Sequence, residues 1–357
     1  MDSDGTLCSS FSGGIFLNQS AKHVSDTFEP DGSKNDLRFV AAGAVLSEKE
    51  VCQLEKRIKE NPSDVAIRLQ LIGYYNKLDR FTESAFEHIL WMIENRARDY
   101  VWYSTLSLSA HKLSSEQFAK FRERWLEQVA TDKSDAKVNG NAAYSIGAKD
   151  FETSERLLRR AQKLNPRDVR WTRRLAQIYR HEALCGLQIH RAKYAKLAMT
   201  QTQRALSLRD APGERVGLLM TVIPIAIDFG HLELARNWSK RFLDLGRKTD
   251  CPLWEQTACL YMARIKLAGQ GSTQAKVWLR KALTSLKAEP KQDGPSHLFK
   301  SNRMMLLLDE LLQRGEKEIV IDTLKLCERK TSGRERDQIK KWLASIRAGG
   351  KPALRFD

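Results

Sequence analysis

The chain has 357 residues, with 60 Lys and Arg against 44 Asp and Glu and a formal net charge of +16. A hydrophobic content of 42% is enough for a sizeable core and excludes a wholly disordered chain. The 9 prolines and 20 glycines are few for an all-β fold with many tight turns. A helix-rich, basic protein of about two domains, or one elongated array, remains.

Cysteine spacing and hydropathy indicate the cellular compartment in which the protein is expected. The six cysteines are far apart and form no CxxC pair, which is not the pattern of a disulfide framework. The N-terminus, MDSDGTLCSSFSGG, is acidic and lacks the apolar core of a secretory signal. The longest apolar stretch, Val216 to Ile227, is shorter than the roughly 20 residues of a membrane span and predicts a buried helix. We expect a cytoplasmic protein with no membrane partner.

Residues 1–45 are predicted to form a disordered Ser- and Gly-rich tail. The first 36 residues carry six acids and two bases, a net charge of −4. The alternative is an unimportant leader, or a start site assigned too far upstream.

N-terminal helical repeats are expected over residues 46–136. Ser47 and Glu50 have the spacing of a capping box, and the helix that they start should end near Glu60, before Pro62. Ser114 and Gln117 predict a second helix start. The apolar spacing after each start is 3 and 4, which favours helices, and no convincing strand is found.

The central part of the chain is repetitive. Residues 141–166 read NAAYSIGAKDFETSERLLRRAQKLNP, which predicts two short helices joined by a Lys-Asp turn. Phe151 opens the second helix, small residues follow at Ser154 and Ala161, and Pro166 ends the unit. Small side chains at those positions let paired helices approach closely, and the aromatic side chain fills the seam.

This pattern resembles the tetratricopeptide repeat, a 34-residue helix–turn–helix unit. It recurs with its first small-residue position at 84, 235, 275 and 320, so the separations are uneven. The resemblance implies an all-α, irregular α-solenoid of antiparallel helix pairs over residues 137–333, closed by a capping helix and tail at 334–357. A compact, non-repetitive helical domain is the alternative.

Two longer stretches of this chain resemble a group of bacterial tetratricopeptide proteins. Residues 60–95 (ENPSDVAIRLQLIGYYNKLDRF, then FEHILWMIEN) are similar to the opening repeat of that group, and residues 301–356 are similar to its closing segment. No biochemical activity is established for that group. The resemblance therefore implies a fold and a protein-interaction role, and no mechanism. This chain departs from the group by carrying more Arg in its middle repeats.

Positive charge is concentrated in residues 156–209, which hold 14 bases and two acids. Placing Leu175 and Tyr179 at the seventh and eleventh repeat positions puts several polar residues on one helix face, at positions that usually line the concave groove of tetratricopeptide arrays. Neighbouring guanidinium groups repel one another unless an anion lies between them, and a carboxylate or phosphate accepts bidentate hydrogen bonds there. The predicted partner-binding residues are Asn141, Arg170, Arg173, Arg174, Gln177 and Arg180.

The favoured function is a non-catalytic protein-interaction scaffold that binds an acidic or C-terminal-carboxylate segment in this Arg-lined groove. The alternatives are that the arginines cap helices and pair with Asp168, Glu152 and Glu155, or that the chain is a basic, α-helical RNA-binding protein. The acidic tail is a further candidate occupant, by opposite charge alone. The partner's identity and the oligomeric state stay open.

Catalytic motifs are absent from the sequence: there is no HExxH, GxSxG, GxxxxGK[ST], GxGxxG or EF-hand loop. His181, Cys185 and His190 come nearest to a metal set, but they do not share one helix face. We expect no enzyme activity, cofactor or metal. An enzyme would need distant His and carboxylate side chains to meet in a pocket with shifted pKa values.

Overall fold

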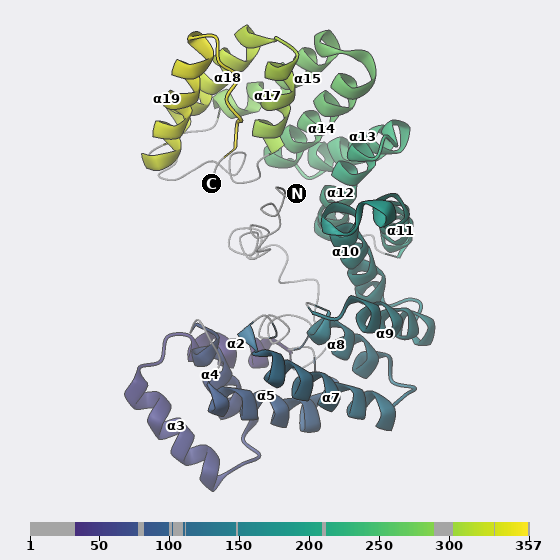
Figure 1. Ribbon diagram of the computed structural model, residues 1–357, viewed down its shortest axis with the longest axis vertical. Coiled ribbons are helices and arrows are strands. Elements are labelled where there is room, and N and C mark those ends of the chain that lie inside the picture. Colours follow the sequence, from purple (N-terminus) through teal and green to yellow (C-terminus); the bar gives the residue numbers. More distant parts are fainter. Residues whose placement is uncertain are drawn as a thin grey trace, which may run out of the picture. The chain divides into compact units, whose positions relative to one another are not determined.

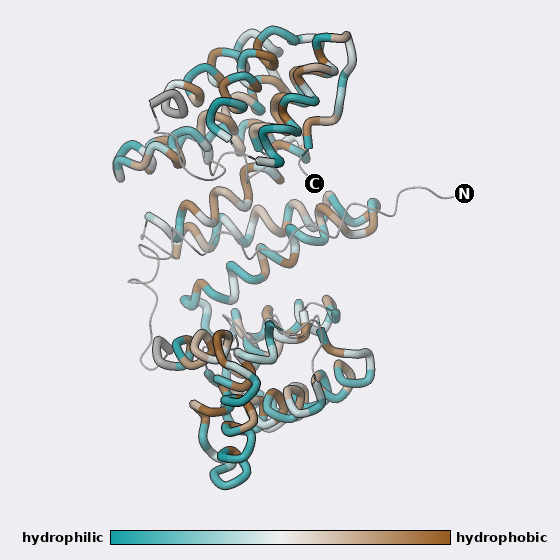
Figure 2. Tube along the Cα trace, turned by 90° about the vertical axis from the view of Figure 1, so that its left-hand side faces the viewer, coloured by the Kyte–Doolittle hydropathy of each residue, from teal (hydrophilic) through white to brown (hydrophobic). Residues whose placement is uncertain are grey.

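The computed structural model describes residues 33–77, 82–99, 102, 110, 112–147, 149–208, 212–288, 303–331 and 333–355. Throughout these residues the regular secondary structure is helical, with no strand. The predicted all-α class is confirmed. Apolar and polar residues alternate along the helices in Figure 2, which is the pattern of helices that bury one side.

The chain forms two compact units, each described by itself. The first comprises Met1–His190 and Thr200–Ala211, and the second comprises Arg191–Met199 and Pro212–Asp357. The sequence boundaries at 136 and 333 were placed by repeat character and stay a prediction.

The first unit is a succession of helices in which α3 to α10 pack on their neighbours along the described chain, whereas α2 packs on α4. The α8–α9 hairpin and its neighbours are visible in Figure 1. The helices are α2 (Ser33–Gly43), α3 (Glu48–Glu60), α4 (Val65–Asn76), α5 (Glu83–Arg96), α7 (Ser115–Thr131), α8 (Ala136–Ile146), α9 (Phe151–Leu164) and α10 (Val169–Cys185), and α11 (Gln188–Ser207) contributes to both units.

Both predicted capping boxes are confirmed. The Ser47 side chain accepts from the Glu50 backbone amide, and the Glu50 carboxylate accepts from the Ser47 amide at 2.8 Å. Ser114 and Gln117 form the same reciprocal pair at the start of α7. Each pair satisfies two amides that a helix start leaves without partners, which fixes where α3 and α7 begin.

The predicted seam between α8 and α9 is confirmed. Phe151 is the first residue of α9, and Ser154 and Ala161 are fully buried. The Ser154 hydroxyl donates to the Ala143 carbonyl of α8 at 2.8 Å. A small residue is required here because the two backbones are close enough for this direct bond.

Helix α2 corrects the prediction that the tail extends to residue 45, because the part from Ser33 to Gly43 is helical. A Cβ on Gly43 would lie 1.9 Å from the Gln70 carbonyl oxygen, and one on Gly73 would lie 2.1 Å from that of Val40. Glycines on both sides thus let the α2 and α4 backbones touch. Residues 1–32, which hold most of the predicted acidic tail, lie outside the described residues.

The second unit repeats the small-residue seam. Ala235, Ala275, Ala282, Val320 and Cys327 are all buried. Helices α13, α14 and α15 pack in chain order, as Figure 1 shows. The helices of this unit are α12 (Pro212–Asp228), α13 (Leu232–Lys248), α14 (Pro252–Gln270), α15 (Ser272–Ala288), α17 (Arg303–Gln313), α18 (Lys317–Lys330) and α19 (Gly333–Arg347).

Helix α12 contains the long apolar stretch and, as predicted, is a buried helix despite Pro224 in its interior. A proline has no N–H, so the carbonyl four residues earlier, on Met220, loses its helical donor. The Tyr261 hydroxyl of α14 donates to that carbonyl at 3.2 Å. A neighbouring helix thus supplies the donor that α12 lacks.

Helix α19 has the polarity expected of a terminal cap. Ile339, Trp342, Leu343 and Ile346 are buried on one side. The basic residues on its other side are all exposed: Arg336, Lys340, Lys341 and Arg347. An array of helices needs such a polar outer face over its last apolar layer.

Candidate functional site

Helix α10 is held against α8 by a glycine–tryptophan contact. A Cβ on Gly140 of α8 would lie 2.2 Å from the Trp171 ring of α10. Trp171 is fully buried, so the ring occupies the place where a larger side chain would stand. The contact brings the predicted polar face of α10 beside α8.

The structure brings the predicted residues of α10 together on one helix. Each is half-buried: Arg170, Arg173, Arg174, Gln177 and Arg180. Their spacing of three and four residues puts them along one side of α10, as the sequence indicates.

Arg170 forms an ion pair with Asp168, as expected if the arginines pair with carboxylates of this chain. Its Nη2 donates to Oδ2 of Asp168 at 2.6 Å and its Nε donates to Oδ1 at 3.0 Å. Asp168 also accepts from the Arg170 backbone amide as the N-cap of α10. Arg159 and Glu155 form a second pair of this kind, at 2.9 Å. Arg170 therefore stabilises the N-terminus of α10 through the N-cap residue Asp168.

Arg174 has a different environment. Its guanidinium carbon lies over the Tyr144 ring of α8, 3.9 Å from the centroid. Its Nη1 donates to Oε1 of Gln177 at 3.4 Å, and the Tyr144 hydroxyl donates to the same oxygen at 3.4 Å. The Arg174 Nε is buried and makes no hydrogen bond with any described residue. The guanidinium is thus held in place by an aromatic ring and an amide, without a carboxylate partner.

Asn141 differs from its predicted role. Its side chain is 2% exposed, and its Nδ2 donates to the backbone carbonyls of Ala97 and Asp99, at 2.9 and 3.0 Å. Those carbonyls follow the end of α5, so Asn141 ties that chain segment to α8. Because the side chain is buried and its Nδ2 is taken up by these carbonyls, Asn141 is not placed to receive a partner segment and acts as a positioning residue.

A second polar cluster, which the sequence analysis missed, joins α3, α4 and α5. Oε1 of Glu55 accepts from the Tyr75 hydroxyl at 2.7 Å, from the Ser84 hydroxyl at 2.8 Å and from Nε2 of His88 at 3.2 Å. On the other side of the imidazole, Arg68 Nη1 contacts Nδ1 at 3.0 Å. These residues line a cavity of about 580 Å³.

The partners determine the histidine tautomer. A guanidinium only donates, so His88 Nδ1 accepts from Arg68 and Nε2 carries the proton that Glu55 accepts. Burial raises the pKa of Glu55, but the hydrogen bonds from His88, Tyr75 and Ser84 outweigh it and hold the pKa at about 2. Burial and the bond to Glu55 raise the pKa of Tyr75 to about 12.

The Glu55 cluster is a set of satisfied bonds between helices. Arg68 also donates to the Pro62 carbonyl through Nε and Nη2, at 3.0 and 2.7 Å, and lies 4.2 Å from the centre of the Trp91 ring. The His88 nitrogens are both occupied, so neither is placed to take a proton from a substrate. Shifted pKa values in this cluster follow from its structural bonds.

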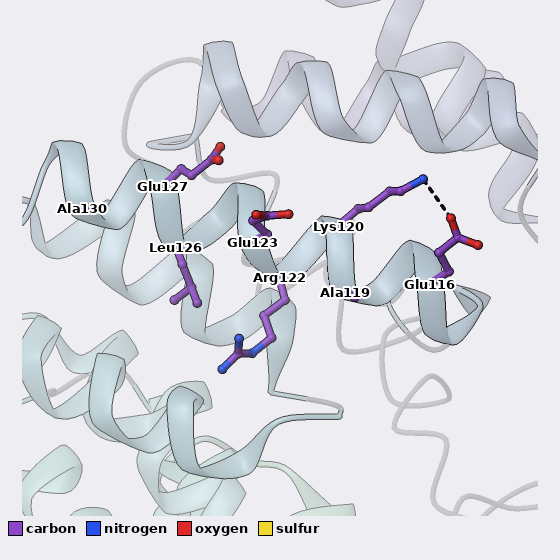
Figure 3. Close-up of a pocket in the computed structure, with 8 residues that line it drawn as sticks. All are labelled: Glu116, Ala119, Lys120, Arg122, Glu123, Leu126, Glu127 and Ala130. Carbon is purple, nitrogen blue, oxygen red and sulfur yellow. Dashed lines mark ion pairs between the residues drawn. The ribbon is translucent and has the colours of Figure 1, made fainter.

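A surface hollow of about 600 Å³ lies along α7 (Figure 3). Every residue that lines it belongs to this one helix, including Leu126 and the Lys120–Glu116 ion pair at 3.0 Å that the figure marks. Glu123 and Glu127 extend away from Leu126 and Arg122 in that view. No convergent set of functional groups is formed there.

Neither a metal-binding cluster nor a membrane-spanning helix occurs in the described part of the chain. Across the described part of the chain, no three or more His, Cys, Asp or Glu side chains gather as a metal set. None of the described helices combines the length and apolar character that crossing a membrane requires.

Comparison with known proteins yields a structural likeness without a family match. No family model and no curated protein matches the chain. The chain is similar to the crystal structure of yeast Tom70, with a TM-score of 0.45 and 14% sequence identity. The match covers 91% of this chain and 66% of that chain, just short of two thirds of its length. A likeness at this level carries no argument about partners or activity, and the resemblance to bacterial tetratricopeptide proteins stays a prediction.

Proposed function

We propose that the chain is a non-catalytic interaction scaffold that binds an acidic or C-terminal-carboxylate segment of a partner protein along α10. The cytoplasmic location is part of this proposal and rests on the wide cysteine spacing. The binding residues are Arg173, Arg174, Gln177 and Arg180.

The proposal rests mainly on the environment of the Arg174 guanidinium. Its guanidinium is held against Tyr144 with a buried Nε and no carboxylate among the described residues. A carboxylate that reaches it accepts hydrogen bonds from a donor that is already positioned, which lowers the entropic cost of binding. Arg173 and Arg180 lie one position before and six after it, so they add positive charge on the same half-buried side of α10.

The test is fluorescence anisotropy with a labelled octapeptide of alternating Ser and Glu, prepared with a free C-terminal carboxylate and as its C-terminal amide. We expect Arg174→Gln to weaken binding about tenfold, because one charge-assisted pair is worth roughly 1.5–3 kcal/mol. Arg173→Glu/Arg180→Glu should abolish binding without lowering the melting temperature. A weaker affinity of the amide would identify the terminal carboxylate as the group bound.

The matched control is Arg156→Glu/Arg160→Glu, which makes the same change of charge on α9. Equal loss in the control would mean that bulk charge is measured, and the α10 site would be wrong. Unfolding of the Arg173→Glu/Arg180→Glu variant would make those arginines structural, and unchanged binding by folded Arg174→Gln would then reject the site.

A further inference from the structure

The outer side of α9 carries a row of cations that the α10 site does not use. Arg156, Arg160, Lys163 and Arg167 are all exposed. None of their side chains makes an ion pair or hydrogen bond with any described residue. They differ in this from Arg159 on the same helix, which pairs with Glu155.

Helix geometry aligns these cations. Arg156, Arg160 and Lys163 are four and three residues apart, so they lie within about 60° of one another around α9 and about 4.5–6 Å apart along its axis. Arg167 continues the row just past the end of the helix. The one acid at this edge is Glu152, a turn before Arg156.

The neighbouring helix, α11, also carries an exposed cation. Gln162 of α9 donates to Gln201 of α11 at 2.8 Å, so this part of α11, which belongs to the same unit, lies beside α9. Arg204, three residues after Gln201, is also exposed. Arg156, Arg160 and Lys163 on α9 thus repel one another with no described acid paired to them.

We propose that this outer α9 surface, made of Arg156, Arg160, Lys163 and Arg167, binds the phosphate backbone of single-stranded nucleic acid. The surface offers fully hydrated, evenly spaced charges, which suit a polymer with one charge per nucleotide and gain affinity through counterion release. A peptide partner would need recesses for its side chains, and this face presents only Leu164, at 41% exposure, as a large apolar group.

The α9 sequence, FETSERLLRRAQKL, has no aromatic residue after Phe151 on which bases can stack. The surface therefore binds without regard to base sequence. It does not depend on the α10 peptide site.

The test measures binding of a fluorescein-labelled 20-nucleotide polyuridine RNA across a salt series. Arg156→Gln/Arg160→Gln/Lys163→Gln should reduce the slope of log affinity against log salt by about 2, because each phosphate contact contributes about 0.7 for a single strand. Arg156→Lys/Arg160→Lys keeps the charges and should keep the slope. Thermal melting checks that each variant is folded.

The matched control is Lys49→Gln/Lys56→Gln/Arg57→Gln, which removes three exposed charges from α3 of the same unit. A slope that falls equally in this control would overturn the proposal, since net charge alone would then explain binding. Arg173→Glu/Arg180→Glu, which abolishes peptide binding at α10, should leave most RNA affinity intact.

The competing partner is tested with a labelled 20-residue polyglutamate. If polyglutamate binds as tightly as the RNA and loses affinity in the same α9 variant, the surface is a site for acidic proteins and the nucleic-acid assignment is wrong. Weaker polyglutamate binding that the α9 variant does not change supports the assignment.

Discussion

At Glu55, three donors converge on one carboxylate oxygen, and this makes local stability depend on pH. The folded pKa of about 2 lies below the ordinary glutamate pKa of 4.5. A carboxylate with a lowered folded pKa contributes stability that is complete above about pH 4.5 and is lost as the pH falls toward 2.

We therefore expect the free energy of unfolding to fall less in the Glu55→Gln variant than in the unmodified chain when the pH is lowered from 5 to 2. The difference should be on the order of 2 kcal/mol, discounted for partial exposure to water. Urea unfolding at stepped pH measures it. Parallel pH profiles for the two proteins would contradict the bonding described at Glu55.

Gly140 is the residue at which steric contact and helix propensity oppose each other. Alanine is the better helix former by about 1 kcal/mol, but its Cβ would collide with the buried Trp171 ring. We expect Gly140→Ala to destabilise the chain by about 2 kcal/mol, measured by chemical unfolding. Gly217→Ala in α12 is the control, since nothing lies within 4 Å of the added Cβ, and it should stabilise by up to about 1 kcal/mol.

At the scale of an element, α12 depends on α14 for one hydrogen bond. Tyr261→Phe removes the hydroxyl that donates to the Met220 carbonyl, and the expected loss is about 1 kcal/mol. In a Pro224→Ala background the helix regains its own amide donor, so the same change should cost less. A double-mutant cycle measures the coupling, and equal losses in both backgrounds would reject this account of the proline.

Sequence pattern predicts the elements well because their signals are local. A capping box is formed by residues three positions apart, as at Ser47 and Ser114, and a small residue such as Ser154 reports a close helix pair wherever the chain turns back on itself. Helix α2 escaped prediction because its stabilising contacts are between glycines and a distant helix. Its first four residues, Ser33 to Asp36, are as polar as the tail before it.

At the scale of the whole molecule, the division into two units predicts separate responses to mutation. Gly140→Ala should reduce hydrogen-exchange protection in α8, α9 and α10 and leave α13, α14 and α15 unchanged. Tyr261→Phe should reduce protection in α13, α14 and α15 and leave α8, α9 and α10 unchanged. Protection that falls throughout the chain in either variant would mean that the two units unfold as one.

The sequence by itself determined the all-α class, the starts of α3 and α7, the small-residue seams and the concentration of positive charge. Each of these depends on residue types within a few positions of one another, and helical periodicity makes them readable. It also placed five candidate residues on one side of α10.

Only the tertiary structure decided what those side chains touch. Packing of α8 on α10 set Arg174 over Tyr144 and left Asn141 buried against the end of α5. Glu55 and His88, 33 residues apart, meet only because α3 and α5 pack around α4. Spacing along a helix decides which residues share a face, whereas contacts between helices depend on which face each neighbour buries.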